Sequence, residues 1–142
     1  MPATGENTQG CVMTRDGNHV YVTNSRSNSI SIVNTQSRKV EREIATGAGP
    51  NRIFLSPDEK TLLYSFQAGE GMGFADVATA KETARIALPG PPLSLSLSKD
   101  GQTAFLGIQD SDKIVVISVP QRKIIRAFDT PPNSGPDSIE PL

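Results

Sequence analysis

The residue types most often used for catalysis are scarce in this sequence. Cys11 is the single cysteine and His19 the single histidine among 142 residues. One thiol forms no intrachain disulfide, and one thiol with one imidazole falls short of the four ligands of a structural zinc site. A general base needs a nucleophile beside it, and the sequence places none beside His19. We therefore favour a surface or hydrogen-bonded role for His19 and a small buried apolar role for Cys11.

Two further motifs have both a chemical and a structural interpretation. Asp16-Gly17 and Asp100-Gly101 contain carboxylates suited to calcium, but a calcium loop needs several oxygen ligands at alternating positions. Asp-Gly is also a preferred pair in hairpin turns, which is the interpretation we adopt. The glycine-rich segment 69–73 resembles a phosphate-binding loop, but no helix is expected after it to receive the phosphate. We therefore expect a solvated loop at 69–73, no metal ion and no cofactor.

Composition limits the class of protein. The formal net charge is -1, with 14 Lys and Arg against 15 Asp and Glu, and 36% of the residues are hydrophobic against 20% charged. This balance is typical of one soluble domain and excludes both a disordered tail and a basic nucleic-acid binder. The longest apolar run, near 114–119, is far shorter than the roughly 18 residues of a membrane span. Residues 1–7 lack the features of a secretory signal peptide, so we expect a cytoplasmic protein or a missing upstream segment.

A repeat of 42 residues organises the chain. Three turn motifs, 14–17, 56–59 and 98–101, place their aspartates 42 residues apart. Other positions keep the same step: Ile44, Ile86 and Phe128; Ile30, Met72 and Ile114; Ile32, Phe74 and Val116; Lys39, Lys81 and Lys123; Pro50 and Pro92. The period divides the chain into a leader 1–7, three units at 8–49, 50–91 and 92–135, and a tail 136–142.

Each unit contains four short segments of strand character. In the first unit one strand ends near Thr14, and the segments 19–24, 29–34 and 39–44 follow, rich in β-branched residues or alternating in polarity. The corresponding segments are 52–55, 61–66, 72–77 and 81–88 in the second unit and 93–97, 103–108, 113–119 and 123–128 in the third. Turns about ten residues apart favour an all-β meander over alternating strands and helices.

The charge of the strands indicates how each unit is oriented. The fourth strand of each unit carries the most Lys, Arg and Glu, as expected of an exposed edge strand that must not pair with other chains. The first strands are largely uncharged and suit an interior. Four strands per repeat, apolar inside and charged outside, predict an all-β fold of three four-stranded antiparallel β-propeller blades of about 42 residues.

The first unit also resembles a known repeat. Tyr21-Val22-Thr23-Asn24, with the segments 29–35, 39–40, 47–50 and 56–58, is similar to the repeat of the YVTN β-propeller family. The second and third units keep the frame but have other residues at 63–66 and 105–108 in place of the signature. The resemblance implies a ring of usually seven blades, a periplasmic or extracellular location, and a binding or accessory role more often than catalysis.

Three blades form an incomplete ring, because propellers typically have about 4 to 8. Segment 135–139 (Gly-Pro-Asp-Ser-Ile) copies 49–53 (Gly-Pro-Asn-Arg-Ile), which is the start of a blade. We expect the missing blades to come from a longer parent chain of which this is the C-terminal part. The alternative source is a second copy, joined head to tail into a six-bladed ring. Both accounts predict apolar faces at the two end blades.

In this topology the loops between blades and the loops between second and third strands gather around the mouth of the channel. The candidate ligand residues there are polar and without dominant charge: Asn24, Asn51, Arg52, Gln67, Glu70, Gln109, Asp110 and Asp137. A mixed rim of this kind suits a protein segment or a small polar molecule better than a phosphate-rich ligand.

These observations favour a non-catalytic binding or scaffold protein that presents loops to a protein, cell-envelope or small-molecule partner. Two alternatives stay open. A lactonase-like propeller hydrolase needs positioned acid and base groups or a metal, for which the chain offers at most Arg52, Asp137, Glu70 and His19. An accessory protein of a periplasmic redox system rests on the family resemblance alone, because the sequence has no Cys-x-x-Cys-His haem motif.

Overall fold

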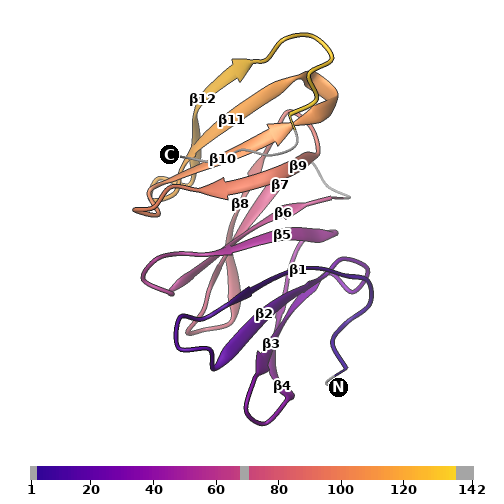
Figure 1. Ribbon diagram of the computed structural model, residues 1–142, viewed down its shortest axis with the longest axis vertical. Coiled ribbons are helices and arrows are strands. Elements are labelled where there is room, and N and C mark those ends of the chain that lie inside the picture. Colours follow the sequence, from indigo (N-terminus) through magenta and orange to yellow (C-terminus); the bar gives the residue numbers. More distant parts are fainter. Residues whose placement is uncertain (1–2, 68–70, 137–142) are drawn as a thin grey trace.

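The computed structural model of the protein describes residues 3–67 and 71–136, which form three four-stranded antiparallel sheets (Figure 1). Sheet one contains β1 (Thr8–Met13), β2 (His19–Asn24), β3 (Ser29–Asn34) and β4 (Lys39–Ala45). Sheet two contains β5 (Pro50–Leu55), β6 (Thr61–Phe66), β7 (Gly71–Asp76) and β8 (Lys81–Ala87). Sheet three contains β9 (Pro92–Leu97), β10 (Thr103–Ile108), β11 (Lys113–Ser118) and β12 (Lys123–Asp129), with the short 3-10 turn η1 (Gln109–Ser111) between β10 and β11.

The predicted all-β fold of three four-stranded sheets is confirmed. Each sheet keeps its strands in chain order, and each lies within one 42-residue unit. The bounds of β2, β3, β6 and β10 agree with the predicted segments, and the others differ by one or two residues at an end. The turn η1 was not predicted; it ends at Asp112 in the left-handed conformation, with φ 47°. Among the described residues no helix has the length and apolar character needed to cross a membrane.

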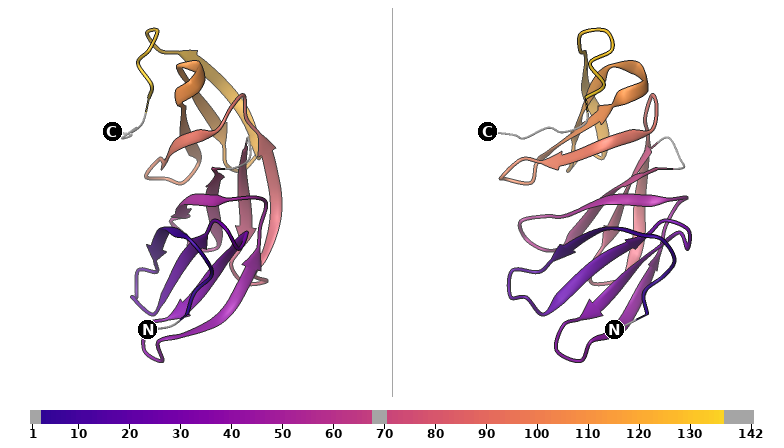
Figure 2. Two further views of the ribbon diagram at one scale, coloured as in Figure 1. Left: turned by 90° about the vertical axis from the view of Figure 1, so that its right-hand side faces the viewer. Right: turned by 45° about the vertical axis from the view of Figure 1, so that its right-hand side comes forward.

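The three sheets follow one another face to face along a curved stack (Figure 2). Their first strands β1, β5 and β9 are neighbours, and β4 contacts β8 at the outer side. Each connection therefore leads from the outermost strand of one sheet to the innermost strand of the next. This is the arrangement of successive propeller blades.

Apolar side chains fill the two spaces between the sheets. Between sheets one and two lie Tyr21, Ile30, Ile32, Ile44, Ile53, Leu62, Tyr64, Phe66 and Ala75. Between sheets two and three lie Leu63, Met72, Phe74, Ile86, Leu88, Leu95, Ala104, Leu106, Ile108, Val115, Ile117 and Val119. Alternate residues of β6 enter different clusters, because successive side chains of a strand point to opposite faces. Sheet two is thus packed on both of its faces.

Hydrogen bonds to main-chain carbonyls join the sheets around this apolar core. Thr23 Oγ1 donates to the Asn51 carbonyl at 2.7 Å in a buried position. Arg42 Nη1 donates to the Ala78 carbonyl at 2.9 Å, and Arg15 Nη2 donates to the Pro57 carbonyl at 3.1 Å. A carbonyl acceptor is present whatever the side chain, so these contacts depend on the position of the neighbouring backbone.

The Asp-Gly motifs form turns, as predicted, and the same network recurs in each sheet. In sheet two Ser56 Oγ donates to Asp58 Oδ1 at 2.6 Å, and the main-chain nitrogen of Lys60 donates to the same oxygen at 3.1 Å. The main-chain nitrogen of Thr61 donates to Ser56 Oγ at 3.0 Å, which closes the turn. Equivalent bonds join Thr14 to Asp16 at 2.7 Å and Ser98 to Asp100 at 2.6 Å.

The prediction that Cys11 is buried is wrong. Its side chain is exposed, whereas Ile53 and Leu95, which occupy the same repeat position, are each 6% exposed. Ile53 and Leu95 pack against the preceding sheet, and no described sheet precedes sheet one. Burial at this position therefore depends on the neighbouring blade, which local sequence does not show.

Replacing the turn glycines should separate backbone strain from packing. Gly17 and Gly101 have φ values of +73° and +72°, so alanine at either position costs about 1–2 kcal/mol of backbone strain. A Cβ at Gly17 would meet nothing within 4 Å, whereas one at Gly101 would lie 2.4 Å from Pro57 Cδ. In denaturant unfolding we expect Gly101→Ala to lose roughly 1–3 kcal/mol more than Gly17→Ala. Equal losses would contradict the contact between the two turns.

The turn carboxylates should make stability fall in acid. Hydrogen bonds from Thr14, Ser56 and Ser98, followed by main-chain bonds, lower the pKa of Asp16, Asp58 and Asp100. A lowered pKa in the folded state gives stability that is present above the ordinary value of about 3.9 and is lost as pH falls below it. We expect thermal unfolding of the triple Asp→Asn variant to depend less on pH between neutrality and strong acid. An unchanged pH profile in that variant would contradict the assignment.

Candidate functional site

Two of the predicted rim residues, Asn24 and Asn51, are buried in the structure. Asn24 is fully buried, so the prediction that it lines a rim is wrong. The described part of the leader covers it: a Cβ on Gly5 would lie 2.7 Å from Asn24 Cβ. Asn24 Nδ2 donates to Ser31 Oγ at 2.9 Å and to Ser29 Oγ at 3.2 Å. Its role is therefore to join the ends of β2 and β3.

Asn51 is also buried, at 7% exposed, and its carbonyl accepts the inter-sheet bond from Thr23. It is buried because it begins the innermost strand of sheet two, against β2 of sheet one. Four candidates are exposed. Arg52 lies with its Nε 3.4 Å from the Leu93 carbonyl, Gln67 follows β6, and Gln109 and Asp110 are neighbours on η1. Glu70 and Asp137 lie outside the described residues.

A different set of polar residues converges between sheets one and two. A cavity of about 250 Å³, hereafter the first groove, is lined by His19, Tyr21, Ile32, Glu41, Arg42 and Val77. His19 and Tyr21 are two residues apart on β2 and so share one face. Tyr21 pairs with Ile32, and Ile32 pairs with Arg42, which places these side chains in one row across the sheet.

A bulge in β4 adds a further group to the first groove. The register between β3 and β4 shifts between Ile32 and Val33, so that Arg42 pairs with Ile32 and Val40 pairs with Val33. Glu41 is the extra residue, and a β-bulge of this kind changes where a side chain points. Glu41 and Arg42 therefore both line the groove although they are adjacent in the chain.

His19 and Glu41 form a hydrogen-bonded pair at the mouth of the first groove. His19 Nε2 lies 3.0 Å from Glu41 Oε2, with side-chain exposures of 35% and 42%. Asn34 Nδ2 donates to the other carboxylate oxygen at 2.8 Å. The bonds from Asn34 and then His19 lower the pKa of Glu41, which favours the carboxylate form. His19 is thus hydrogen-bonded, as the sequence favours.

Tyr21 forms the buried wall of the first groove. The residue is 3% exposed, and its hydroxyl oxygen is not among the buried side-chain atoms that lack a hydrogen-bond partner in the described part of the chain. Burial, followed by the negative charges of Glu59 and Asp16, raises the pKa of the Tyr21 hydroxyl. The hydroxyl therefore remains protonated and keeps both its donor and its acceptor capacity for another molecule.

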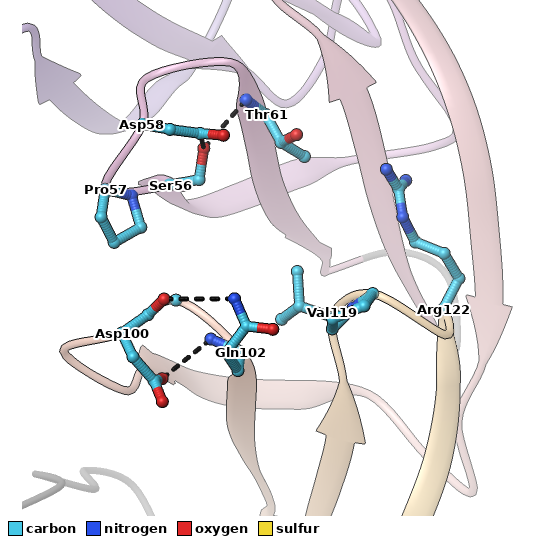
Figure 3. Close-up of a pocket in the computed structure, with 10 residues that line it drawn as sticks. Ser56, Pro57, Asp58, Thr61, Asp100, Gln102, Val119 and Arg122 are labelled. Atoms are coloured by element: carbon cyan, nitrogen blue, oxygen red, sulfur yellow. Dashed lines mark hydrogen bonds between the residues drawn. The ribbon is translucent and has the colours of Figure 1, made fainter.

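A second groove lies between sheets two and three and shares two repeat positions with the first, at Thr61 and Val119 (Figure 3). It encloses about 300 Å³ beside the turns that carry Asp58 and Asp100. One period after His19, Tyr21, Glu41 and Arg42 stand Thr61, Leu63, Thr83 and Ala84. The fold therefore does not require ionisable or aromatic residues at these four positions.

Arg122 is the cation of this second groove, and it is engaged by its neighbours. Its guanidinium carbon lies 4.3 Å from the centre of the Phe74 ring, and Nη1 donates to Thr83 Oγ1 at 3.1 Å. Asp58 and Asp100 are held by their own turns. The polar side chains of both grooves are thus engaged within the protein, since His19, Glu41 and Arg42 of the first groove also have hydrogen-bond partners.

A third cavity, of about 340 Å³, lies beside Gly47, Phe66 and Arg85. Arg85 is ion-paired with Glu82, and Glu82 accepts hydrogen bonds from the Tyr64 hydroxyl at 2.7 Å and the Gly47 nitrogen at 3.2 Å. This network joins sheets one and two. It occupies both carboxylate oxygens of Glu82 with partners from the protein itself. Within the part of the chain that the structure describes, no three His, Cys, Asp or Glu side chains gather where a metal ion would bind.

Comparison with known proteins identifies the family. Residues 3–88, more than half of the chain, match the family model of YNCE-like β-propellers. The chain belongs to the YNCE-like β-propeller family. A search among curated proteins finds no match.

Solved structures agree with this propeller assignment. The chain is similar to Kuenenia stuttgartiensis hydrazine synthase, with a TM-score of 0.83 and 21% identity, over 92% of this chain and 38% of that one. It is also similar to the β-propeller domain of Myceliophteria thermophila Cps50 (Swd1), with a TM-score of 0.76 and 12% identity, over 87% and 43% of the two chains. At these identities the likeness establishes the propeller fold alone. The chain spans less than half the length of either protein.

The two tyrosines of the protein provide a direct test of the site. Burial first, and then nearby carboxylates, raise the pKa of both Tyr21 and Tyr64 above the ordinary value of about 10. In a spectrophotometric titration of the folded protein we expect no tyrosinate to form near pH 10, while the urea-unfolded chain ionises there. Ionisation of one tyrosine near pH 10 in the folded state would contradict the raised pKa of that tyrosine.

Proposed function

We propose that this YNCE-like propeller is a non-catalytic binding and scaffold protein whose three described blades belong to a larger ring. The observation that carries the proposal is that apolar positions buried between two sheets are exposed on the outer faces of the stack. Phe128 on β12 is 43% exposed, whereas Ile44 and Ile86 at the same repeat position are 0% and 9% exposed. The side of sheet three that bears Phe128, here called the leading face, therefore has the apolar residues of a blade interface without a blade on it.

The opposite side of sheet one, here called the trailing face, shows the same contrast. Met13 is 59% exposed and Cys11 is exposed. One period later, Leu55 packs against the core between sheets one and two, and Ile53 is part of it. Both end faces thus carry apolar side chains at positions that the inner sheets bury, as blades of a ring would.

The chain after β12 supports a further blade over the leading face. The Pro136 carbonyl oxygen lies 2.4 Å from the point that a Cβ on Gly107 would occupy. Thr23, which precedes Gly107 by two periods, donates to the Asn51 carbonyl at the start of sheet two. Segment 135–136 has the Gly-Pro sequence of 49–50, where β5 begins. The chain therefore enters the place where the next innermost strand would start.

We take further blades of the same parent chain as the source, with a second copy of this chain as the alternative. Dimers in light scattering would favour the second copy. The narrower assignment to the YVTN repeat and the extracytoplasmic location that it implies belong to the same proposal. Its ligand contacts would come from exposed rim residues such as Arg52, Gln67 and Gln109 and from the first groove.

A lactonase-like hydrolase is the second candidate, because the His19–Glu41 contact at 3.0 Å is the arrangement of an oriented general base. Lactone hydrolysis that is lost in His19→Gln, while the fold is kept, would favour it over a binding protein. No specific contact favours the redox accessory role.

Adding a blade to the chain should show whether the leading face is a blade interface. We consider the chain extended after Gly135 by a copy of residues 50–91, whose trailing face already fits a leading face. In this extended chain Phe128→Ala should cost about 3–5 kcal/mol in denaturant unfolding, as expected for a buried phenylalanine. In the present chain the cost should be below about 1 kcal/mol, because the ring is partly solvated.

Ala127→Ser is the matched control, because Ala127 is exposed on the same strand and pairs with Val115, which faces sheet two. It should have nearly the same effect in both chains. An equal cost of Phe128→Ala in the two chains would contradict the proposal.

A further inference from the structure

The three sheets differ at the positions that meet the following sheet, and in this respect sheet three resembles sheet one. Two such positions carry a cation in sheets one and three but not in sheet two. They hold Arg15, Pro57 and Lys99 at the first position and Arg42, Ala84 and Arg126 at the second. We therefore call sheets one and three blades of the first kind and sheet two a blade of the second kind.

The turn between the first and second strands of a sheet contacts the same turn of the next sheet through matched residues. Between sheets one and two, the main-chain nitrogen of Arg15 donates to Glu59 Oε1, and Arg15 Nη2 donates to the Pro57 carbonyl at 3.1 Å. Between sheets two and three, the repeat positions of Arg15 and Glu59 hold Pro57 and Gly101. A Cβ on Gly101 would lie 2.4 Å from Pro57 Cδ, so the two residues fit only because one is glycine.

The turn between the third and fourth strands is matched in the same way. Arg42 of sheet one donates from Nη1 to the Ala78 carbonyl of sheet two at 2.9 Å, and Ala80 lies two residues further along that turn. Between sheets two and three the arginine is on the other side of the interface. Arg122, one period after Ala80, donates from Nη1 to Thr83 Oγ1 at 3.1 Å. Each interface thus receives its arginine here from one sheet and a small residue from the other.

The leading face carries both cations of a blade of the first kind. Lys99 and Arg126 are exposed, and they occupy the positions of Arg15 and Arg42. In the interface between sheets one and two, these positions meet main-chain carbonyls and the carboxylate of Glu59. A following blade of the same chemistry would supply a carboxylate beside Lys99 and a carbonyl to Arg126. The interface between sheets one and two therefore indicates what the leading face receives.

A second copy of this chain would not match the leading face, because its sheet one is also of the first kind. It would place Gly17 beside Lys99, where sheet two has a carboxylate at the same position. It would also place Arg38 where sheet two has Ala80, on the side that faces Arg126. Like charges brought together across an interface repel each other and suppress that pairing.

We propose that the leading face binds a propeller blade of the second kind and not a second copy of this chain. The bound blade presents a carboxylate at the position of Glu59, a main-chain carbonyl at that of Ala78 and a small uncharged residue at that of Ala80. This inference rests on the proposed ring, because it specifies the blade that continues it. Blades of the two kinds then alternate along the parent chain.

Two extended chains test the proposal. Both continue the protein after Gly135, one with a copy of residues 50–91, which is of the second kind, and one with a copy of residues 8–49, which is of the first kind. Phe128→Ala reports whether the added blade covers the leading face. We expect it to raise the unfolding equilibrium constant at least about a hundredfold in the second-kind chain and less than about fivefold in the first-kind chain.

The outcomes separate this inference from the ring proposal. A hundredfold effect of Phe128→Ala in both chains would keep the ring and overturn the selectivity for the second kind. A small effect in the second-kind chain would contradict the ring itself. In the unchanged protein, a dimer whose NMR shifts fall on both end faces would show a second copy on the leading face and would overturn the proposal.

Arg126→Ala tests the charge matching directly. In the second-kind chain it should raise the unfolding constant about tenfold, because a charged donor loses its carbonyl acceptor. In the first-kind chain it should leave that constant unchanged or lower it, because it removes a repulsion with the copied Arg38. Lys123→Ala is the matched control, since lysine stands at this position of β12 in all three sheets, and its effect should be the same in both chains. Equal effects of Arg126→Ala in the two chains would overturn the proposal.

Discussion

Face-to-face packing of successive sheets is the constraint on which the structure depends. Each sheet has two apolar faces, and only a neighbouring sheet can cover them. At about 25 cal/mol per Å² of apolar surface, this burial outweighs the few inter-sheet hydrogen bonds at its edges. The arginine contacts to main-chain carbonyls then fix how each sheet is placed against the next.

The same packing determines what local sequence predicts. The 42-residue period, the strands and the Asp-Gly turns follow from short-range patterns, and they appear in the structure almost unchanged. The burial of individual side chains does not follow from these short-range patterns. Cys11 is exposed because no described blade packs on its side of sheet one. Asn24 is buried because Gly5, which precedes the first repeat unit, lies against it.

The first groove was missed because its residues meet only in three dimensions. Tyr21 belongs to the repeat signature, and a single histidine with no nucleophile beside it in the sequence favours a surface or hydrogen-bonded role for His19. The bulge in β4 that brings Glu41 beside Arg42 has no simple sequence signal. A signal was nevertheless available: comparison one period apart shows four chemically active residues opposite Thr61, Leu63, Thr83 and Ala84. In repeat proteins, departures from the repeat mark residues that the fold does not require.

Amide hydrogen exchange tests the central role of sheet packing most directly. The strands β2 and β3, β6 and β7, and β10 and β11 are the central pairs of the three sheets, so their hydrogen bonding is equivalent. If two-sided packing governs stability, the slowest amides of the monomeric chain lie in β6 and β7, and the outer sheets exchange through partial opening from either end. Equally slow exchange in all three pairs, or slowest exchange in an outer sheet, would contradict this account.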